Sequence, residues 1–168
     1  MKNLLYIGLF ILLSSCWPKS IGFKDGSMPE EWKTFYVQTL NNNSSNTPLS
    51  YPVDLSEDIK DGIQNNTRLQ LNNEQDDAEV FIEGNIVTYS ITPVALQEGD
   101  NAAKNRLTVS VQFTILISKP EEKEMLLNST RYLDYDSDTD LGVVENELLE
   151  EVNEQITQDV INKLLSNW

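Results

Sequence analysis

Histidine is absent from this sequence of 168 residues, and cysteine occurs once, as Cys16. Histidine is the usual general base and metal ligand near neutral pH, so a catalytic cysteine has no partner here. One cysteine can form neither an internal disulfide nor a cysteine-rich zinc site. Nothing in the spacing of the many carboxylates selects an acid–base pair. We therefore predict that the protein is not an enzyme, and that it holds no metal and no cofactor.

Basic residues are also scarce, because 12 lysines and arginines are set against 27 aspartates and glutamates. The resulting formal net charge of −15 repels nucleic-acid phosphates, and no basic stripe with interleaved aromatic residues offsets it. We therefore expect no nucleic-acid partner. The length of the chain allows one domain with its own hydrophobic core.

A long apolar run is missing as well. The apolar segment Leu4–Leu13 follows Lys2 and is ten residues long, whereas a membrane-spanning helix needs roughly twenty. This pattern predicts a cleavable signal peptide over residues 1–15. It ends in "LSSC", which resembles the bacterial lipobox, where the signal peptidase cuts before a cysteine that is then acylated. Because the sole cysteine stands at that position, we prefer a lipobox to an ordinary signal with a chance cysteine.

The predicted mature chain begins at Cys16. Residues 16–31 would carry the lipid and form a tether, and residues 32–168 would form a single domain. Trp17 follows the cysteine, in place of the aspartate that retains some lipoproteins in the inner membrane. The acidic cluster that exports some lipoproteins to the cell surface is missing too. The expected location is therefore the inner leaflet of the outer membrane, with the domain lipid-anchored and facing the periplasm.

Alternation of apolar and polar residues predicts five β-strands in this domain. A slip in the apolar phase between Ile86 and Tyr89 indicates a β-bulge or burial on both faces of the strand. Residues 92–105 are predicted to form a long loop. The five strands are expected at residues 33–39, 67–71, 80–91, 106–117 and 125–136.

Two helices are predicted as well. Asp54 and Glu57 form a capping-box pattern at the start of the first helix, and Gly62 would allow close packing there. The second helix is expected over residues 143–166. The apolar stripes expected to face the core are Leu55, Ile59 and Ile63 in the first helix and Val144, Leu148, Leu149, Val152, Ile156, Val160, Ile161, Leu164 and Leu165 in the second.

The order of these elements, β-α-β-β-β-β-α, predicts an α+β fold. We expect a two-layer sandwich in which two helices pack on one face of a small mixed β-sheet. Most of the sheet would be an antiparallel meander, and the right-handed crossover rule implies that the first two strands are parallel.

An ordered set of segments resembles a known family. The lipobox is followed by "TRLQL", "VTYSITPVAL", "NRLTVSVQF", "STRYLDYDS" and the C-terminal "VENELLEEVNEQITQDVINKLLSNW". No single segment is a specific motif, but together they resemble the LptE family of lipopolysaccharide-assembly lipoproteins, in its Bacteroidetes-type form. The resemblance implies two helices on a small mixed sheet and no catalytic residues. It also implies an anchor in the outer membrane and a place as a plug inside the β-barrel translocon LptD, which inserts lipopolysaccharide into the outer leaflet.

Direct contact with lipopolysaccharide would need a local cationic spot, because the acidic surface opposes an anionic ligand at long range. Four residues could supply it: Arg68, Lys104, Arg106 and Arg131. Lys104 and Arg106 end the predicted long loop and are the favoured pair. The alternative is that each of the four is an ordinary surface charge.

The segment 134–140 places four aspartates two residues apart, and Glu147 lies eleven residues past Asp136. This spacing resembles a calcium loop, but Leu141 stands where the sharp turn needs glycine, so a solvated loop is the favoured interpretation. Two functions therefore remain: the translocon plug, and a stand-alone periplasm-facing lipoprotein module that binds a lipid or cell-envelope ligand. For the plug, the loops at 92–105 and 134–142 are expected to face the barrel.

Overall fold

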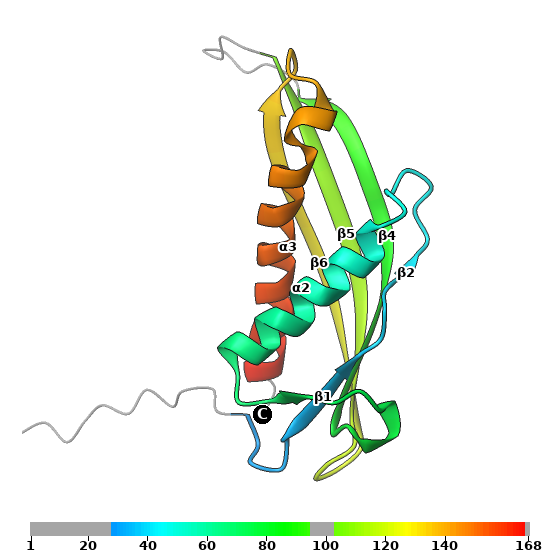
Figure 1. Ribbon diagram of the computed structural model, residues 1–168, viewed down its shortest axis with the longest axis vertical. Coiled ribbons are helices and arrows are strands. Elements are labelled where there is room, and N and C mark those ends of the chain that lie inside the picture. Colours follow the sequence, from blue (N-terminus) through cyan, green and yellow to red (C-terminus); the bar gives the residue numbers. More distant parts are fainter. Residues whose placement is uncertain (1–27, 95–102, 167–168) are drawn as a thin grey trace, which may run out of the picture.

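The computed structural model describes residues 28–94 and 103–166, and all statements on its architecture refer to these residues. Two helices, α2 (Tyr51–Asn66) and α3 (Leu141–Leu165), pack on one face of a six-stranded sheet (Figure 1). The strands are β1 (Thr34–Val37), β2 (Asn41–Asn42), β3 (Gln70–Leu71), β4 (Val80–Val94), β5 (Lys104–Ile117) and β6 (Lys123–Asp136), with a 3-10 turn at Gln75–Asp77. The predicted two-layer α+β fold is confirmed.

The sheet is mixed, with the strand order β3-β1-β4-β5-β6 and with β2 added to β4 beside β1. Strands β1 and β3 are parallel, as the crossover rule predicts, and β1 is also parallel to β4. The long strands β4, β5 and β6 form the antiparallel meander. In Figure 1 the β5–β6 turn marks the lower end of the sheet, and the end of β4 with the start of β5 marks the upper end.

The predicted signal peptide at 1–15 and Cys16 lie outside the described residues, as do residues 16–27 of the predicted tether. The described part begins with Met28, which is 4% exposed and belongs to the core. Trp32 Nε1 donates a hydrogen bond to the carbonyl of Lys119 in the β5–β6 turn, at 2.8 Å. The packed region therefore includes residues that were predicted to belong to the tether, and it begins at the lower end of the sheet.

The N-cap of helix α2 lies four residues earlier than the capping box predicts. The N-cap position is Ser50 and not Asp54, which instead lies in the first turn. Pro52 suits that turn because its missing N–H would have no partner inside the helix. Tyr51 is 1% exposed, so its packing in the core decides where the helix starts.

Helix α3 begins at Leu141 because the side chain of Asp140 accepts a hydrogen bond from Gly142 N at 2.8 Å. Its predicted stripe faces the sheet, but the buried residues of the stripe all lie at or after Val152. Val144 and Leu148, near the N-terminus, are half-buried. The buried part of the stripe consists of Val152, Ile156, Val160, Ile161 and Leu164.

The predicted bulge is confirmed in β4, where the register with β5 shifts between Ile86 and Thr88. The predicted loop at 92–105 is shorter than expected, because β4 continues to Val94 and β5 starts at Lys104. Residues 95–102 lie outside the described part. Strand β2 was missed and assigned to a loop. Its two residues are exposed and pair in parallel with Asn85 and Ile86 far along the chain, so no local alternation signals it.

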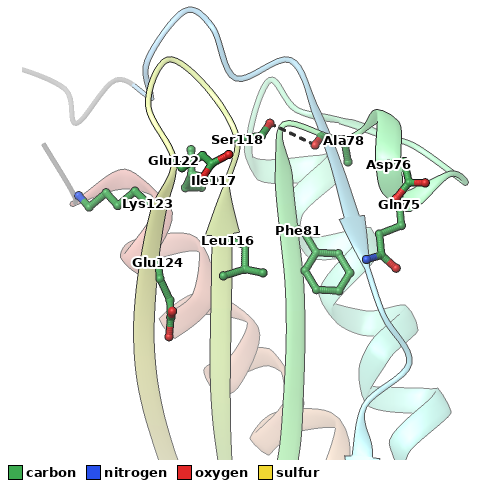
Figure 2. A pocket seen from close by; sticks show the side chains of 10 residues that line it. All are labelled: Gln75, Asp76, Ala78, Phe81, Leu116, Ile117, Ser118, Glu122, Lys123 and Glu124. Carbon is green, nitrogen blue, oxygen red and sulfur yellow. Dashed lines mark hydrogen bonds between the residues drawn. The ribbon is translucent and has the colours of Figure 1, made fainter.

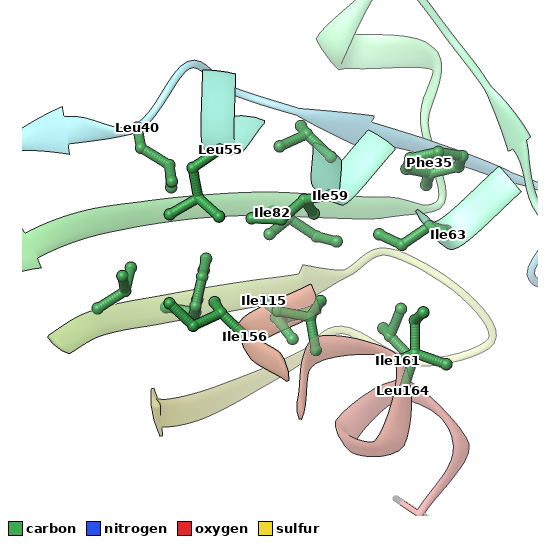
Figure 3. Packing of buried hydrophobic residues seen from close by; sticks show 14 of the residues in the cluster. Phe35, Leu40, Leu55, Ile59, Ile63, Ile82, Ile115, Ile156, Ile161 and Leu164 are labelled. Carbon is green, nitrogen blue, oxygen red and sulfur yellow. The ribbon is translucent and has the colours of Figure 1, made fainter. Parts of the chain in front are cut away.

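The core lies between the sheet and the two helices (Figure 3). Leu55, Ile59 and Ile63 of α2 are fully buried, as the predicted stripe requires. They face β1 and β4, where Phe35 and Ile82 are also fully buried, whereas α3 lies over β6. Each buried aliphatic side chain contributes about 1.5–3 kcal/mol to folding.

Glu79, just before β4, is held by β1. Thr34 donates to Glu79 Oε2 from its backbone N–H, at 2.9 Å, and from its hydroxyl, and Lys119 Nζ lies 3.3 Å from Oε1. These contacts, the Thr34 hydroxyl above all, lower the pKa of Glu79 from its ordinary 4.5 to about 2. A lowered pKa stabilises the folded state above about pH 4.5, and this stabilisation is lost as the pH falls toward 2.

Thr34→Val is therefore expected to lower the free energy of unfolding near neutral pH by about 1.5–3 kcal/mol, the contribution of a hydrogen bond to a charged group. The difference between variant and parent should shrink as the pH falls through the range between 4.5 and 2, because Glu79 becomes protonated in both. Urea unfolding across this range measures it. A variant that loses the same free energy at every pH would contradict the coupling.

Candidate functional site

The face of the sheet away from the helices, here called the outer face, carries the exposed side chains of β4, β5 and β6. In the middle of β5 and β6 these side chains are uncharged. Charged groups lie only toward the two ends of this part of the outer face. From β5 the outward residues are Arg106, Thr108, Ser110, Gln112, Thr114 and Leu116, and from β6 they are Glu124, Leu126, Asn128, Thr130, Tyr132 and Asp134.

A hollow of about 470 Å³ lies on the outer face beside the β5–β6 turn, at the lower end of Figure 1, which is at the top in Figure 2. Its floor is apolar, because Phe81 and Leu116 lie directly opposite each other on β4 and β5. Tyr36 of β1 stacks on Phe81 with 5.8 Å between ring centroids, which extends the aromatic surface. Glu122, Lys123, Glu124 and Asp76 add charges to the lining. The hollow can therefore hold a small apolar group near charges of both signs.

Arg106 lies at the upper end of the outer face. It makes a bidentate pair with Asp134 of β6, at 2.6 Å from Nε and 2.8 Å from one terminal nitrogen. Its guanidinium carbon lies 3.9 Å from the ring centroid of Tyr132. The hydrogen bonds from Arg106 lower the pKa of Asp134, and Lys104 nearby adds to this effect. Arg106 is therefore largely neutralised, and Lys104 remains exposed beside it.

Arg131 points to the opposite face of the sheet. It sits across from Val109, whose side chain is buried in the core, and it pairs with Asp159 of α3. Ser129 also donates to Asp159, at 2.6 Å. The contacts of Arg131 and Ser129 with Asp159 fasten α3 to β6. The hydrogen bonds from Arg131 to Asp159 raise the pKa of Arg131.

Arg68 lies after α2, just before β3, toward the lower end of the sheet. It donates hydrogen bonds to the backbone carbonyls of Met28 and Pro29, and so fastens the start of the packed region. The four predicted cations are therefore not brought together. Of the four, only Lys104 and Arg106 are neighbours on one surface. Arg131 is paired with Asp159 of α3, and Arg68 binds backbone carbonyls at the start of the packed region.

An acidic groove between α2 and α3 was missed at the sequence level. Its volume is about 350 Å³, and it is lined by four carboxylates: Asp58, Asp61, Glu150 and Glu154. Beside it, Asn153 donates to Asp58 at 2.7 Å and accepts from the hydroxyl of Tyr51 at 2.8 Å. The two pairs of acids are about 90 residues apart in the chain, so no motif could join them.

The segment 134–140 shows no calcium-like arrangement. Asp134 is paired with Arg106, and Asp140 caps α3. Among residues 28–94 and 103–166, no group of three or more acidic, histidine or cysteine side chains is placed to hold a metal ion. Within the same ranges, neither helix combines the length and apolar character needed to cross a membrane.

Comparisons with known proteins agree with this fold. A family model described as "LptE: Lipopolysaccharide-assembly" matches residues 32–164. Similar solved structures include a minor lipoprotein from Acinetobacter baumannii, with 16% identity, a TM-score of 0.53, and 81% of this chain and 94% of that chain covered. A variant of PelC from Paraburkholderia phytofirmans, solved as a dodecamer, has 12% identity, a TM-score of 0.50, and coverage of 84% and 92%. At these identities the likeness shows the fold alone.

No significant match was found among curated proteins. The family model nevertheless spans β1 to the last turn of α3, which is well over half of the chain and nearly all of the described domain. The match covers the ordered segments that suggested the family from the sequence, apart from the lipobox and the last residues. The chain therefore belongs to the LptE family of lipopolysaccharide-assembly proteins.

Proposed function

We propose that the protein is anchored to the inner leaflet of the outer membrane through acylated Cys16, and that its domain faces the periplasm. There it seats inside an LptD-type β-barrel translocon, assists assembly of that barrel and supports insertion of lipopolysaccharide into the outer leaflet. The observation that carries this proposal is the family match over residues 32–164. The sequence contains no histidine, the usual general base and metal ligand near neutral pH.

The shape of the domain supports the same proposal. Helix α3 has 25 residues and is about 37 Å long, and it runs along the three long strands (Figure 1). Such a long, narrow domain can enter a barrel end-on. We propose that the segments 92–105 and 134–142 face the barrel wall. The described ends of the first segment, Val94 and Lys104, lie at the upper end of the sheet, while the packed region at Met28 starts at the lower end.

Co-purification tests the proposal directly. A tagged full chain, extracted in detergent from outer membranes, is expected to bring a β-barrel partner with it, and its depletion is expected to lower surface lipopolysaccharide. Re-expression of the parent chain in the depleted strain serves as the control. Recovery of the protein as a free monomer, together with unchanged surface lipopolysaccharide, would contradict the proposal.

The hollow at the lower end of the outer face supports a second candidate function. Its floor of Phe81 and Leu116 would suit an acyl chain, and a stand-alone periplasm-facing module for a lipid or cell-envelope ligand could use it. This function predicts that the ligand stabilises the isolated protein. It also predicts that depletion leaves surface lipopolysaccharide unchanged.

Lys104 and Arg106 are the proposed contact for lipopolysaccharide phosphates, and Asp134 competes for Arg106. Asp134→Asn is therefore expected to strengthen binding of purified lipopolysaccharide several-fold, and Arg106→Gln to weaken it, because phosphate and carboxylate use the same guanidinium. Lys33→Gln, which removes an exposed cation just before β1 at the other end of the sheet, is the control. Fluorescence titration at fixed salt measures the three variants. Weaker or unchanged binding by Asp134→Asn would contradict this site.

A further inference from the structure

Strand β6 forms a long edge of the sheet, because it pairs with β5 on one side and, among the described residues, with no strand on the other. Ser137 N donates to the carbonyl of Ala103 at 3.0 Å, which places this pair in the hydrogen-bonded register. In an antiparallel ladder the register alternates, so odd-numbered residues of β6 bond to β5. Even-numbered residues from Glu124 to Asp136 therefore direct their N–H and C=O groups away from the sheet, and all seven have exposed side chains.

The other sheet edges in the described part of the chain are protected. Strand β3 is two residues long. On the upper half of β4, Ser44 Oγ accepts from Tyr89 N at 3.0 Å, and Pro93 has no N–H to offer. Strand β6 lacks these kinds of protection in the described part of the chain. Its 14 residues contain no proline, and its register with β5 is continuous, so no β-bulge interrupts the edge. A long, regular edge is a template for an added strand.

A second copy of this chain is a poor partner for that edge in the two antiparallel registers that would pair the most residues of β6. In an antiparallel β6–β6 pair centred on Thr130, Glu124 would lie opposite Asp136. In a pair centred on Ser129, Glu124 would lie opposite Asp134. Like charges directly opposite each other destabilise a strand pair, and the net charge of −15 on each copy adds to the repulsion.

We propose that the outer edge of β6 binds an extended segment of a different polypeptide by strand addition. The partner segment is uncharged where it passes Leu126, Asn128, Thr130 and Tyr132, because the exposed side chains there are uncharged. It is basic at both ends, facing Glu124 at one end and Asp136 at the other. Main-chain hydrogen bonds supply affinity and the two charged ends supply selectivity. This inference is independent of whether the partner is a β-barrel protein.

The test uses the purified full chain and a synthetic peptide of alternating threonine and valine with a lysine near each end. Amide hydrogen exchange, followed by NMR, distinguishes the two sets of β6 amides. The outward amides of Leu126, Asn128, Thr130 and Tyr132 are expected to slow by at least about tenfold on binding. The inward amides, already bonded to β5, should not change. Protection that does not alternate along β6, or none at all, would overturn the proposal.

Two substitutions at one position separate backbone from side-chain contacts. Thr130→Pro removes one outward N–H, which an edge strand tolerates, and is expected to weaken peptide binding by at least about tenfold. Thr130→Ala also loses the contact between Thr130 Oγ1 and Ser110 Oγ, at 2.9 Å, but keeps the N–H and should bind normally. Circular dichroism confirms that both are folded. Equal binding by both variants, or equal binding of a peptide with glutamate in place of lysine, would overturn the proposal.

Discussion

Replacing Phe113 with alanine is expected to lower the free energy of unfolding by about 3–5 kcal/mol, which is the usual cost of deleting a buried aromatic ring. Phe113 is 2% exposed and lies opposite Gly84 on β4. A Cβ atom built on Gly84 would come within 2.8 Å of the Phe113 ring and 2.6 Å of Leu40. The ring, together with Leu40, therefore fills the space that the glycine leaves open, so its deletion leaves a cavity in the core.

Urea unfolding, followed by circular dichroism, measures this loss. Phe113→Leu should cost less, because most of the buried volume stays filled. Leu116→Ala, on the same strand, is the matched control: Leu116 is 40% exposed on the outer face, so its loss should be smaller still. If Phe113→Ala were no more destabilising than Leu116→Ala, the assignment of the core to the helix side of the sheet would be wrong.

Gly62→Ala is expected to lower the free energy of unfolding by about 1–3 kcal/mol, the range for an overpacked core. Alanine is the better helix former by about 1 kcal/mol, so propensity alone predicts the opposite sign. The added Cβ would lie 2.2 Å from Thr157 Cγ2 of α3, so either the Thr157 side chain would have to leave its rotamer or α2 and α3 would have to separate. This geometry confirms the close packing predicted for Gly62.

A second substitution tests the cause. Thr157→Ser removes the methyl group that meets the new Cβ, so the double variant should recover most of the stability that Gly62→Ala loses relative to Thr157→Ser alone. Asn65→Ala, on the exposed side of α2, should be neutral or slightly stabilising and controls for propensity. A double variant as unstable as the sum of the two single variants would contradict a direct clash between Gly62 and Thr157.

The candidate site was less predictable than the fold. Lys104 and Arg106 do lie together, since they are close in the chain, and both belong to the upper end of the sheet. Arg131 joins a different face, because the β5–β6 register places it opposite Val109 and beneath Asp159. The sequence contains no local sign of that register. The acidic groove depends in the same way on how α2 and α3 meet.

Local patterns account for the two-layer α+β fold, the five principal strands, the two helices and the face that each buries. Periodicity carries this information because a residue's neighbours along a strand or helix lie within a few positions. Composition alone also limits catalytic chemistry, since histidine is missing. The starting residue of α2, strand β2, the partners of the arginines and the place of β6 at the edge of the described sheet were decided by the tertiary structure. Each rests on contacts between distant residues, such as Tyr51 with Asn153, and only the packed chain brings such residues together.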